Sequence, residues 1–434
     1  MDCLIDPKKL NGEVKVPPSK SIAHRAVICA ALSDGLSRIS NIDYSDDILA
    51  TMEAMKSFGA KMTKNEDVLE VVGIYATGQL DRKRNIDEVL IDCNESGSTL
   101  RFVVPISTLF PGEHRFIGRG KLGQRPLHTY YNIFDEQGIQ YSYKEGELDL
   151  RVEGKLKSGL YEVTGNVSSQ FISGLLFTLP LLDGDSKIVI TTEMESKGYI
   201  DLTLSALKDF GIHIINHNYQ EFFIKGNQKY KARDYRVEAD FSQAAFFLVA
   251  NALNNEVVLH DLNLDSLQGD KEVIHILERM GMKFYQENGG LTGKPEKELT
   301  ATVIDGSQCP DIIPVLSLAA ALSKGTTKVI NAGRLRIKES DRLHAIATEL
   351  NKIGAKIIEK EDGLIIEGVP SLYGGSAVWS HNDHRIAMTL AIASTVCKTS
   401  ILIEDHECVS KSYPNFWRDF KVLGGRFFER DNGK

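Results

Sequence analysis

The chain contains six copies of one short pattern, in which a helical stretch ends at a glycine and alternating or apolar residues follow. Neighbouring copies lie 70 to 79 residues apart, which argues against chance similarity of ordinary α/β segments. A glycine just past a periodic helix is a C-terminal cap in the left-handed region, and the residues after it fit a strand. Such spacing indicates a structural repeat. The six glycines are Gly59, Gly138, Gly211, Gly281, Gly354 and Gly424.

Each repeat also holds an earlier stretch that is apolar nearly all round, which predicts a core helix. The six stretches are 24–32, 99–110, 170–182, 243–253, 312–322 and 384–396. A residue that can cap a helix N-terminus precedes each of them. These predicted caps are Ser21, Ser98, Ser169, Ser242, Asp311 and Asp383. Strands fit best at 187–193, 256–262, 327–333 and 363–369.

One repeat of about 70 residues buries too little surface to be stable alone, so six should cluster, most plausibly as two groups of three. If equivalent helices of a group are parallel, their N-termini converge on one face. Helix N-termini carry free N–H groups and partial positive charge, so that face attracts anions. The polar residues at the helix fronts are therefore the candidates for function.

Overall charge excludes several partners. A net charge of -8, from 51 basic and 59 acidic residues, argues against nucleic acid and anionic membranes. An anion site must then be a local cluster. The six cysteines are scattered without zinc spacing, so we expect neither metal nor disulfides. The first residues lack a signal-peptide core, and the apolar stretches are too short to span a bilayer, so we expect a cytoplasmic protein.

Cations and hydroxyls stand at several predicted helix fronts. In "PSKSIAHRA", Ser21 and Arg25 share one helical face, next to Lys20. The motif "SSQF" brings Ser168, Ser169 and Gln170 to another front. Taken singly, each fits a capped helix with solvated charges. The stretch around "PSKSIAHRA" is not a glycine-rich nucleotide loop of the usual kinds.

The second half of the chain carries the more specific motifs. "KESDR" contains Lys338, Glu339 and Arg342, although a surface ion-pair network would explain this motif equally well. Arg385 in "NDHRIAM" heads an apolar helix, where an arginine is costly unless an anion pairs with it. The further candidates are Asp311 in "CPDII", Arg125 and Lys411 on predicted loops, and Gly97, which permits close backbone approach to a ligand. Seven cations with two carboxyl groups suit several anionic substrate groups and acid–base chemistry without a metal.

At these residues the chain resembles the 5-enolpyruvylshikimate-3-phosphate synthase (3-phosphoshikimate 1-carboxyvinyltransferase) family. The motifs occur in family order over nearly the whole chain: "PSKSIAHRA", "SDD", "SGSTLR", "QRP", "SSQF", "SKGYID", "GD", "PD", "KESDR", "NDHRIAM" and "SKSYP". The resemblance implies a two-domain inside-out α/β barrel of six βαβαββ repeats, three per domain. The implied domains are residues 1–19 with 238–434 and residues 20–237, with an active-site cleft between them.

The resemblance also implies a reaction and site residues. The family moves the enolpyruvyl group of phosphoenolpyruvate to the 5-hydroxyl of shikimate 3-phosphate and releases phosphate, in aromatic amino acid biosynthesis. The implied catalytic residues are Asp311 as base, Glu339 and Lys411 as candidates for protonating the methylene group, and Lys20 spanning both substrates. Shikimate 3-phosphate would be held by Lys20, Ser21, Arg25, Ser168, Ser169, Gln170, Ser196, Asp311 and Lys338. Phosphoenolpyruvate would be held by Lys20, Gly97, Arg125, Gln170, Arg342, Arg385 and Lys411. We expect a monomer with no cofactor, no metal and only these small-molecule partners.

Several positions depart from the best-known family pattern: Glu95, Ser98, Phe102, Gly198 and Arg334. Arg334 stands where some members carry an asparagine that touches the shikimate phosphate. In the family, the inhibitor glyphosate occupies the phosphoenolpyruvate site against the glycine matching Gly97. These departures bear on the phosphate contact and on glyphosate sensitivity.

Two other functions fit part of the pattern. The related UDP-N-acetylglucosamine enolpyruvyl transferases share the fold, but they carry Lys-Asn where this chain has Lys20-Ser21, and they use a loop cysteine that "GRGKLGQRP" lacks. A non-enzymatic repeat protein that binds phosphorylated anions would explain the cations but not Asp311 together with Glu339.

Overall fold

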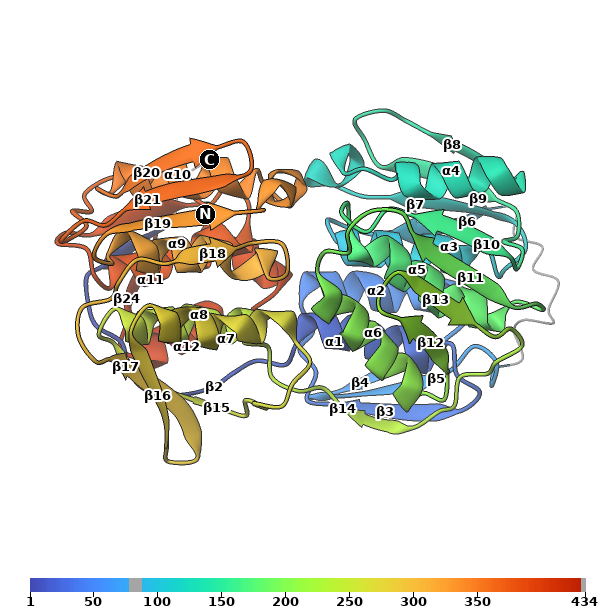
Figure 1. Cartoon of the computed structure of the whole chain (residues 1–434). Coiled ribbons are helices and arrows are strands. Elements are labelled where there is room, and N and C mark those ends of the chain that lie inside the picture. The colour runs from blue at the N-terminus through green and yellow to red at the C-terminus, as the bar shows by residue number, and fades with distance from the viewer. Residues whose placement is uncertain (78–87, 431–434) are drawn as a thin grey trace. The chain divides into compact units, whose positions relative to one another are not determined.

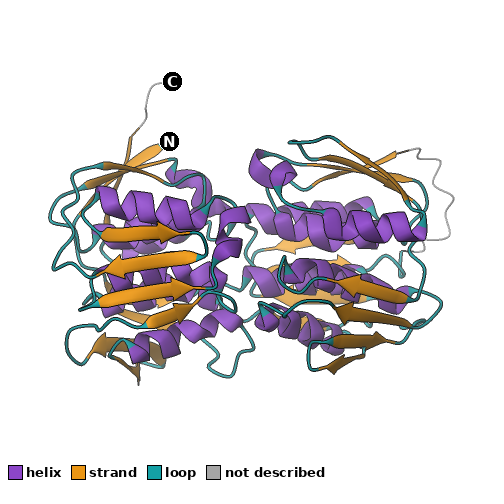
Figure 2. Ribbon diagram, turned by 45° about the horizontal axis from the view of Figure 1, so that its top comes forward, coloured by secondary structure: helices purple, strands orange, loops and turns teal. Residues whose placement is uncertain are grey.

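The computed structural model describes residues 1–77 and 88–430, which divide into two compact units. Unit 1 comprises Met1–Pro17 with Ala239–Lys434, and unit 2 comprises Pro18–Glu238. The boundaries expected at Ser19 and near Glu238 lie within two residues of these positions. In the described residues, each unit contains three four-stranded sheets and its own hydrophobic core. In each unit, sheets cover helices (Figure 2).

All six sheets share one topology. In each sheet two strands are parallel, and an antiparallel pair follows, one strand of which also pairs with the second parallel strand, as in the order β6-β7-β9-β8. In five sheets this antiparallel pair is a hairpin, whereas in the sheet β22-β23-β1-β24 it joins β1 and β24 from distant parts of the chain. A helix crosses between the parallel strands, and another leads into the hairpin. This is the βαβαββ repeat expected from the sequence, and the two-domain α/β fold is confirmed.

Unit 2 takes its first repeat from two distant parts of the chain. Its strand β14 pairs in parallel with β3, some 200 residues earlier, and supplies the first strand of that repeat. The elements of unit 2 in the described residues are α1 (Lys20–Ala31), β3 (Leu36–Ser40), α2 (Asp46–Ser57), β4 (Lys61–Asn65), β5 (Val68–Val72), β6 (Glu88–Asp92), α3 (Gly97–Ser107), β7 (Glu113–Ile117), η1 (Gly120–Gln124), α4 (His128–Gln137), β8 (Gln140–Tyr143), β9 (Asp149–Glu153), β10 (Leu160–Val163), α5 (Ser169–Thr178), η2 (Leu179–Leu181), β11 (Ser186–Ile190), α6 (Lys197–Asp209), β12 (Ile214–His217), β13 (Glu221–Ile224) and β14 (Asp234–Arg236).

Unit 1 is completed by the N-terminal strands. Figure 1 shows β2 beside β15, with which it pairs in parallel, and β1 lies between β23 and β24. The elements of unit 1 are β1 (Asp2–Asp6), β2 (Asn11–Lys15), α7 (Phe241–Ala252), β15 (Glu256–His260), η3 (Gly269–Lys271), α8 (Glu272–Arg279), β16 (Met282–Glu287), β17 (Gly290–Pro295), β18 (Val303–Asp305), η4 (Pro310–Ile312), α9 (Ile313–Ala321), β19 (Thr326–Ile330), η5 (Gly333–Ile337), α10 (Arg342–Lys352), β20 (Lys356–Lys360), β21 (Gly363–Glu367), β22 (Ala377–Trp379), α11 (His384–Ser394), β23 (Ile401–Glu404), η6 (His406–Lys411), α12 (Phe416–Val422) and β24 (Arg426–Arg430).

The repeat glycines end helices as predicted. All six have positive φ, from 69° at Gly138 to 113° at Gly59, and a strand starts within three residues of each. A side chain with a Cβ is disfavoured in this conformation, so glycine is the residue that lets the chain turn from helix to strand.

The six apolar stretches form the inner helices, α1, α3, α5, α7, α9 and α11. In α9 every residue from Ile313 to Ala321 is buried, which is why the stretch is apolar all round. Full burial of one large apolar side chain in such a helix stabilises the fold by about 1.5–3 kcal/mol.

Five of the six predicted N-terminal caps are wrong. Ser21, Ser98, Ser169 and Ser242 lie inside the first helical turn, and Asp311 lies in the η4 turn ahead of α9. The side chains that accept a helix N–H bond are Ser19, Ser96, Ser168, Asp240 and, as predicted, Asp383. A second residue able to cap stands one or two positions earlier in four of the stretches, and there the backbone is still extended, as a cap requires.

No helix among residues 1–77 and 88–430 is long and apolar enough to cross a membrane.

Candidate active site

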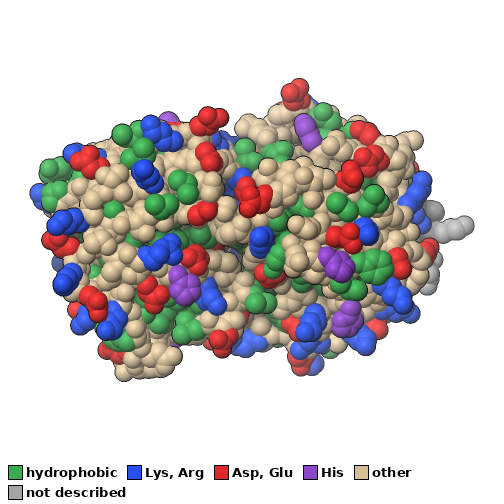
Figure 3. All heavy atoms as spheres, viewed as in Figure 1, with side chains coloured by type: hydrophobic (Ala, Val, Ile, Leu, Met, Phe, Trp, Pro, Cys, Tyr) green, Lys and Arg blue, Asp and Glu red, His purple; other side chains and the backbone are tan. Residues whose placement is uncertain are grey.

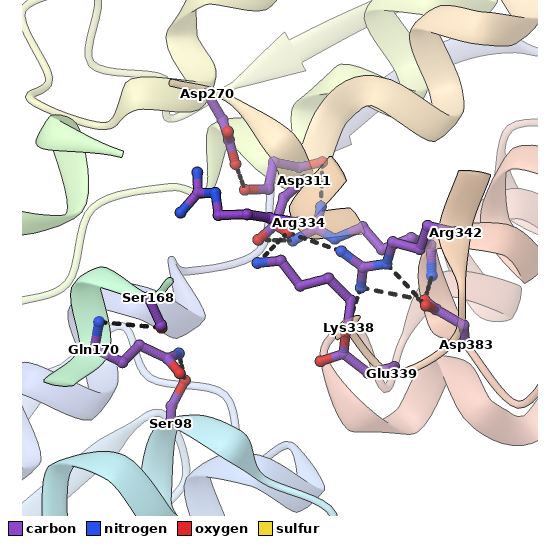
Figure 4. Close-up of polar contacts among 12 residues, drawn as sticks. Ser98, Ser168, Gln170, Asp270, Asp311, Arg334, Lys338, Glu339, Arg342 and Asp383 are labelled. Carbon is purple, nitrogen blue, oxygen red and sulfur yellow. Dashed lines mark hydrogen bonds and ion pairs between the residues drawn. The ribbon is translucent and has the colours of Figure 1, made fainter. Parts of the chain in front are cut away.

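An ion-pair cluster forms in unit 1 where α9, α10 and α11 begin. It consists of five residues labelled in Figure 4, Asp311, Lys338, Glu339, Arg342 and Asp383, together with Arg385. Asp311 lies in the turn before α9, Arg342 is the first residue of α10, and Asp383 caps α11. The fronts of the equivalent inner helices α9 and α11 therefore meet within one unit, as the sequence predicts, and α10, the second helix of its repeat, begins beside them.

Arg342 is the centre of this cluster, with only 1% of its side chain exposed. Its Nε donates to Asp383 Oδ2 at 2.8 Å, its Nη1 to Asp311 Oδ1 at 2.8 Å, and its Nη2 to Glu339 Oε2 at 2.7 Å. A buried guanidinium is tolerated when its charge is matched and its donors are bonded. Arg342 therefore holds the two carboxyl groups predicted for proton transfer in a fixed relation to each other.

Asp311 is surrounded by cations. Lys338 Nζ lies 3.5 Å from its Oδ1, and Arg385 Nη2 lies 3.4 Å from its Oδ2. Burial alone would raise the pKa of Asp311, but Lys338, Arg385 and Arg342 together hold it well below the usual range. Burial lowers the pKa of the Lys338 ammonium, against the attraction of Asp311. Asp311 is thus an ionised carboxylate at neutral pH.

Arg385 and Lys411, the other two predicted cations of unit 1, lie close to the start of α11. Arg385 Nη1 donates to the main-chain oxygen of Ser242 at 3.3 Å, in the first turn of α7. Lys411, the last residue of η6, is buried and donates through Nζ to the main-chain oxygen of Asn382 at 2.8 Å. The prediction that Lys411 lies on a loop missed this 3-10 turn.

In unit 2, α1 carries the first group of predicted residues. Lys20 Nζ pairs with Asp47 Oδ2 of α2 at 2.9 Å. Arg25 is buried, and its three nitrogens donate to Thr203 Oγ1 and to the main-chain oxygens of Ser21 and Tyr199 at 2.7–2.8 Å. Burial lowers the pKa of Arg25 to about 10. Arg25 therefore ties α1 to α6 within this unit.

Gln170 is fixed between two neighbours on α3. Its Nε2 donates to Ser98 Oγ at 2.8 Å, and its Oε1 accepts from Arg101 Nη1 at 2.9 Å. Ser168, the cap of α5, accepts from the main-chain N–H of Gln170 at 3.3 Å, and Ser169 is buried beside it. Figure 4 shows Ser98, Ser168 and Gln170 together. The "SGSTLR" and "SSQF" motifs, which begin 72 residues apart, thus meet.

Gly97 is the first residue of α3 and lies against Arg125. A Cβ added there would overlap Arg125 Nη1 and come within 3.3 Å of Arg101 Nη1. Ser196 occupies the N-cap position of α6 in the left-handed conformation and is buried. Glycine at 97 therefore leaves room for a guanidinium group at the helix front.

Sequence reasoning missed three residues of these groups as site residues: Asp47, Arg101 and Asp383. Asp47 and Arg101 lie in the motifs "SDD" and "SGSTLR", and at Asp383 the sequence indicates only a helix cap. Each acts by pairing with a residue that was predicted, at sequence separations of 27, 69 and 41 residues. The sequence signal for an anionic partner is an arginine at the front of an apolar helix, as at Arg385.

Six βαβαββ repeats in two units, with charged helix fronts and a buried carboxylate among cations, are the architecture that the resemblance to the enolpyruvyl transferase class implied. The family model of EPSP synthase (3-phosphoshikimate 1-carboxyvinyltransferase) matches residues 5–420. The chain is 69% identical over 430 residues to a 3-phosphoshikimate 1-carboxyvinyltransferase of Clostridium beijerinckii, covering 99% of each chain. It is 64% identical over 433 residues to that of Clostridioides difficile, again covering 99% of each.

Solved structures agree with the sequence comparisons. An EPSP synthase from Acinetobacter baumannii superimposes with a TM-score of 0.79 at 26% identity, covering 99% of this chain and 100% of that one. The chain belongs to the EPSP synthase family. It is a transferase of the shikimate pathway, and the resemblance drawn from its motifs is confirmed.

Proposed function

We propose that the helix fronts of the two units provide different groups for the family's reaction. In that reaction the enolpyruvyl group of phosphoenolpyruvate moves to the 5-hydroxyl of shikimate 3-phosphate, and phosphate is released. The hydroxyl loses a proton as its oxygen bonds to the central carbon of phosphoenolpyruvate. The methylene carbon gains a proton, and it loses one again when phosphate leaves and the double bond re-forms. The enzyme must therefore move protons while it neutralises several anionic groups.

Asp311 is proposed as the base that takes the hydroxyl proton. Its contacts with Lys338, Arg342 and Arg385 support this role, since they hold it ionised and oriented. A carboxylate with so low a pKa is a weak base. Anionic substrate groups that pair with Lys338 and Arg385 would partly neutralise these cations, so the pKa of Asp311 rises on binding. The base is then strengthened when the substrates are present.

Glu339 and Lys411 are proposed for protonating the methylene carbon and aiding the departure of phosphate. The carboxyl group of Glu339 is held by Arg342 at 2.7 Å, and the ammonium of Lys411 is held by a main-chain oxygen. A carboxylic acid and an ammonium can each donate a proton, and a fixed position is the first requirement for doing so.

The remaining residues are proposed to bind the substrates. For shikimate 3-phosphate they are Lys20, Ser21, Arg25, Ser168, Ser169, Gln170, Ser196 and Lys338. For phosphoenolpyruvate they are Lys20, Gly97, Arg125, Gln170, Arg342, Arg385 and Lys411. Because Arg25 and Arg342 already donate to protein groups through all three nitrogens, we assign to them mainly positive charge and positioning.

The surface is consistent with small-molecule substrates. On the face shown in Figure 3, basic and acidic side chains are interspersed. Together with the net charge of -8, this supports local anion sites rather than a broad basic surface for nucleic acid.

A phosphate-release assay tests the proposed function. With phosphoenolpyruvate and shikimate 3-phosphate, the chain is expected to release one phosphate per enol ether formed. UDP-N-acetylglucosamine as acceptor is expected to give only background release. Equal turnover with both acceptors, or none with shikimate 3-phosphate, would overturn the substrate assignment.

Gly97→Ala is expected to weaken glyphosate more than phosphoenolpyruvate. The added methyl group displaces the Arg125 guanidinium and narrows the site, and overpacking of this kind costs about 1–3 kcal/mol. The longer inhibitor has less freedom to shift than the substrate. Inhibition constants for glyphosate and KM values for both substrates measure the difference, and KM for shikimate 3-phosphate is the internal control. Equal loss for glyphosate and phosphoenolpyruvate would place the inhibitor away from Gly97.

A further inference from the structure

Asp270 is a buried carboxyl group that none of the roles above uses. It lies on the short η3 turn, and 3% of the residue is exposed. Its Oδ2 accepts a hydrogen bond from the hydroxyl of Ser242 on α7. Burying a carboxyl group is costly unless it is hydrogen-bonded or paired, and here the Ser242 hydroxyl and the charge of Arg385 provide that compensation.

Ser242 connects Asp270 to the ion-pair cluster. Its hydroxyl group binds Asp270, while its main-chain oxygen accepts from Arg385 Nη1 at 3.3 Å. The other terminal nitrogen of Arg385, Nη2, lies 3.4 Å from Asp311 Oδ2. In Figure 4, the Asp270 carboxyl group points toward the side of the cluster where Asp311 lies. One chain of contacts therefore runs from η3 through α7 to the guanidinium beside the proposed base.

Electrostatics link the same groups. Burial and the charge of Asp311 raise the pKa of Asp270, while Arg385 lowers it. Asp270 and Asp311 thus both act on Arg385, which is itself almost fully buried.

We propose that Asp270 is a positioning residue that, through Ser242, sets the orientation of the Arg385 guanidinium for an anionic group of phosphoenolpyruvate. Asp270 holds the hydroxyl of Ser242, and this fixes the first turn of α7, whose carbonyl oxygen holds Nη1. With Nη1 and Nη2 both anchored, the remaining N–H groups keep one direction. The proposal rests on the proposed role of Arg385 in binding phosphoenolpyruvate.

Four variants and a control test it. Asp270→Ala and Ser242→Ala each remove one partner of the hydroxyl–carboxylate bond, and the double variant removes both. Asp270→Asn keeps an oxygen that can accept from Ser242. Asp265→Asn is the control, since Asp265 is an exposed aspartate of the same connection. For each, kcat, the KM of both substrates and the thermal unfolding midpoint are measured.

Each single alanine variant is expected to raise KM for phosphoenolpyruvate about tenfold, the scale on which loss of a supporting partner of a ligating side chain acts. We expect kcat and KM for shikimate 3-phosphate to stay within about threefold, because binding of one substrate is what changes. The double variant should be no worse than either single one, since both break one contact chain. Asp270→Asn should lose less than Asp270→Ala, and Asp265→Asn should match wild type.

Three results would overturn the proposal: an unchanged KM for phosphoenolpyruvate, losses that multiply in the double variant, or KM for both substrates rising together with a lower unfolding midpoint. The last pattern would mean a purely structural role. Failure of the proposed function itself looks different, because the wild-type chain would then show no turnover with the two substrates.

Discussion

Asp311→Asn is expected to lower turnover by about 10²–10⁴-fold, the usual contribution of a positioned general base. The amide keeps the shape of the carboxylate and an oxygen that can accept from Arg342 Nη1, now at 2.8 Å. It cannot take a proton. Removing a negative charge from among Lys338, Arg342 and Arg385 does not oppose anion binding, so KM for both substrates should not rise. Steady-state phosphate release measures kcat, and calorimetric titration measures substrate binding.

A matched control separates the loss of the base from the loss of an acidic side chain. Asp305→Asn changes an aspartate of the preceding strand β18, whose carboxylate bonds Ser307 and Asn331 outside the ion-pair cluster. This variant should retain wild-type turnover. If Asp311→Asn also stayed within a few-fold of wild type, another group would be the base.

Asp383→Ala is expected to destabilise the chain by about 3–5 kcal/mol, the cost of removing one partner of a buried ion pair. The Asp383 side chain is 0% exposed. It accepts from Arg342 Nε at 2.8 Å, from Ser340 Oγ at 3.0 Å and from the main-chain N–H of Arg385 at 2.9 Å. Its removal leaves Arg342 with excess buried charge and leaves α11 without its cap. Urea titration followed by circular dichroism measures the loss.

Asp341→Ala is the matched control, because Asp341 caps α10 in the same unit. It accepts from the main-chain N–H of His344 at 3.1 Å and pairs with the half-buried Arg336. Loss of a cap alone costs about 1 kcal/mol. Equal losses for Asp383→Ala and Asp341→Ala would mean that capping, and not the buried ion pair, explains the role of Asp383.

The helix starts show where sequence reasoning is precise and where it is not. The apolar stretches predicted all six inner helices, because a helix buried on every side must be apolar on every side. The predicted caps differ from the observed ones because pairs such as Ser19 with Ser21, or Asp240 with Ser242, give the helix two possible starting residues of similar local energy. In the structure the earlier residue of each pair is the cap, because the backbone there is still extended and its side chain accepts a helix N–H bond.

The candidate residues show the same division. Lys20, Asp311 and Arg342 are recognisable from the sequence because each places an ionisable group at the front of a predicted helix. The contrast between the charged group and the apolar residues that follow can be seen without the structure. Their partners did not stand out. Asp47, Asp383 and Asp270 are common residues in ordinary turns and caps, and only a long-range contact gives them a role.

By itself, the sequence determined the repeat, the inner helices, the glycine turns and the family of this protein. These depend on residues a few positions apart, where periodicity, capping and backbone preference act. The tertiary structure alone decided that β2 and β14 complete distant repeats, that Arg342 binds three carboxylates, and that Asp270 reaches Arg385 through Ser242. Such contacts join residues tens to hundreds of positions apart. They form only when helices and sheets pack, because the burial of apolar surface then offsets the entropy of bringing distant segments together.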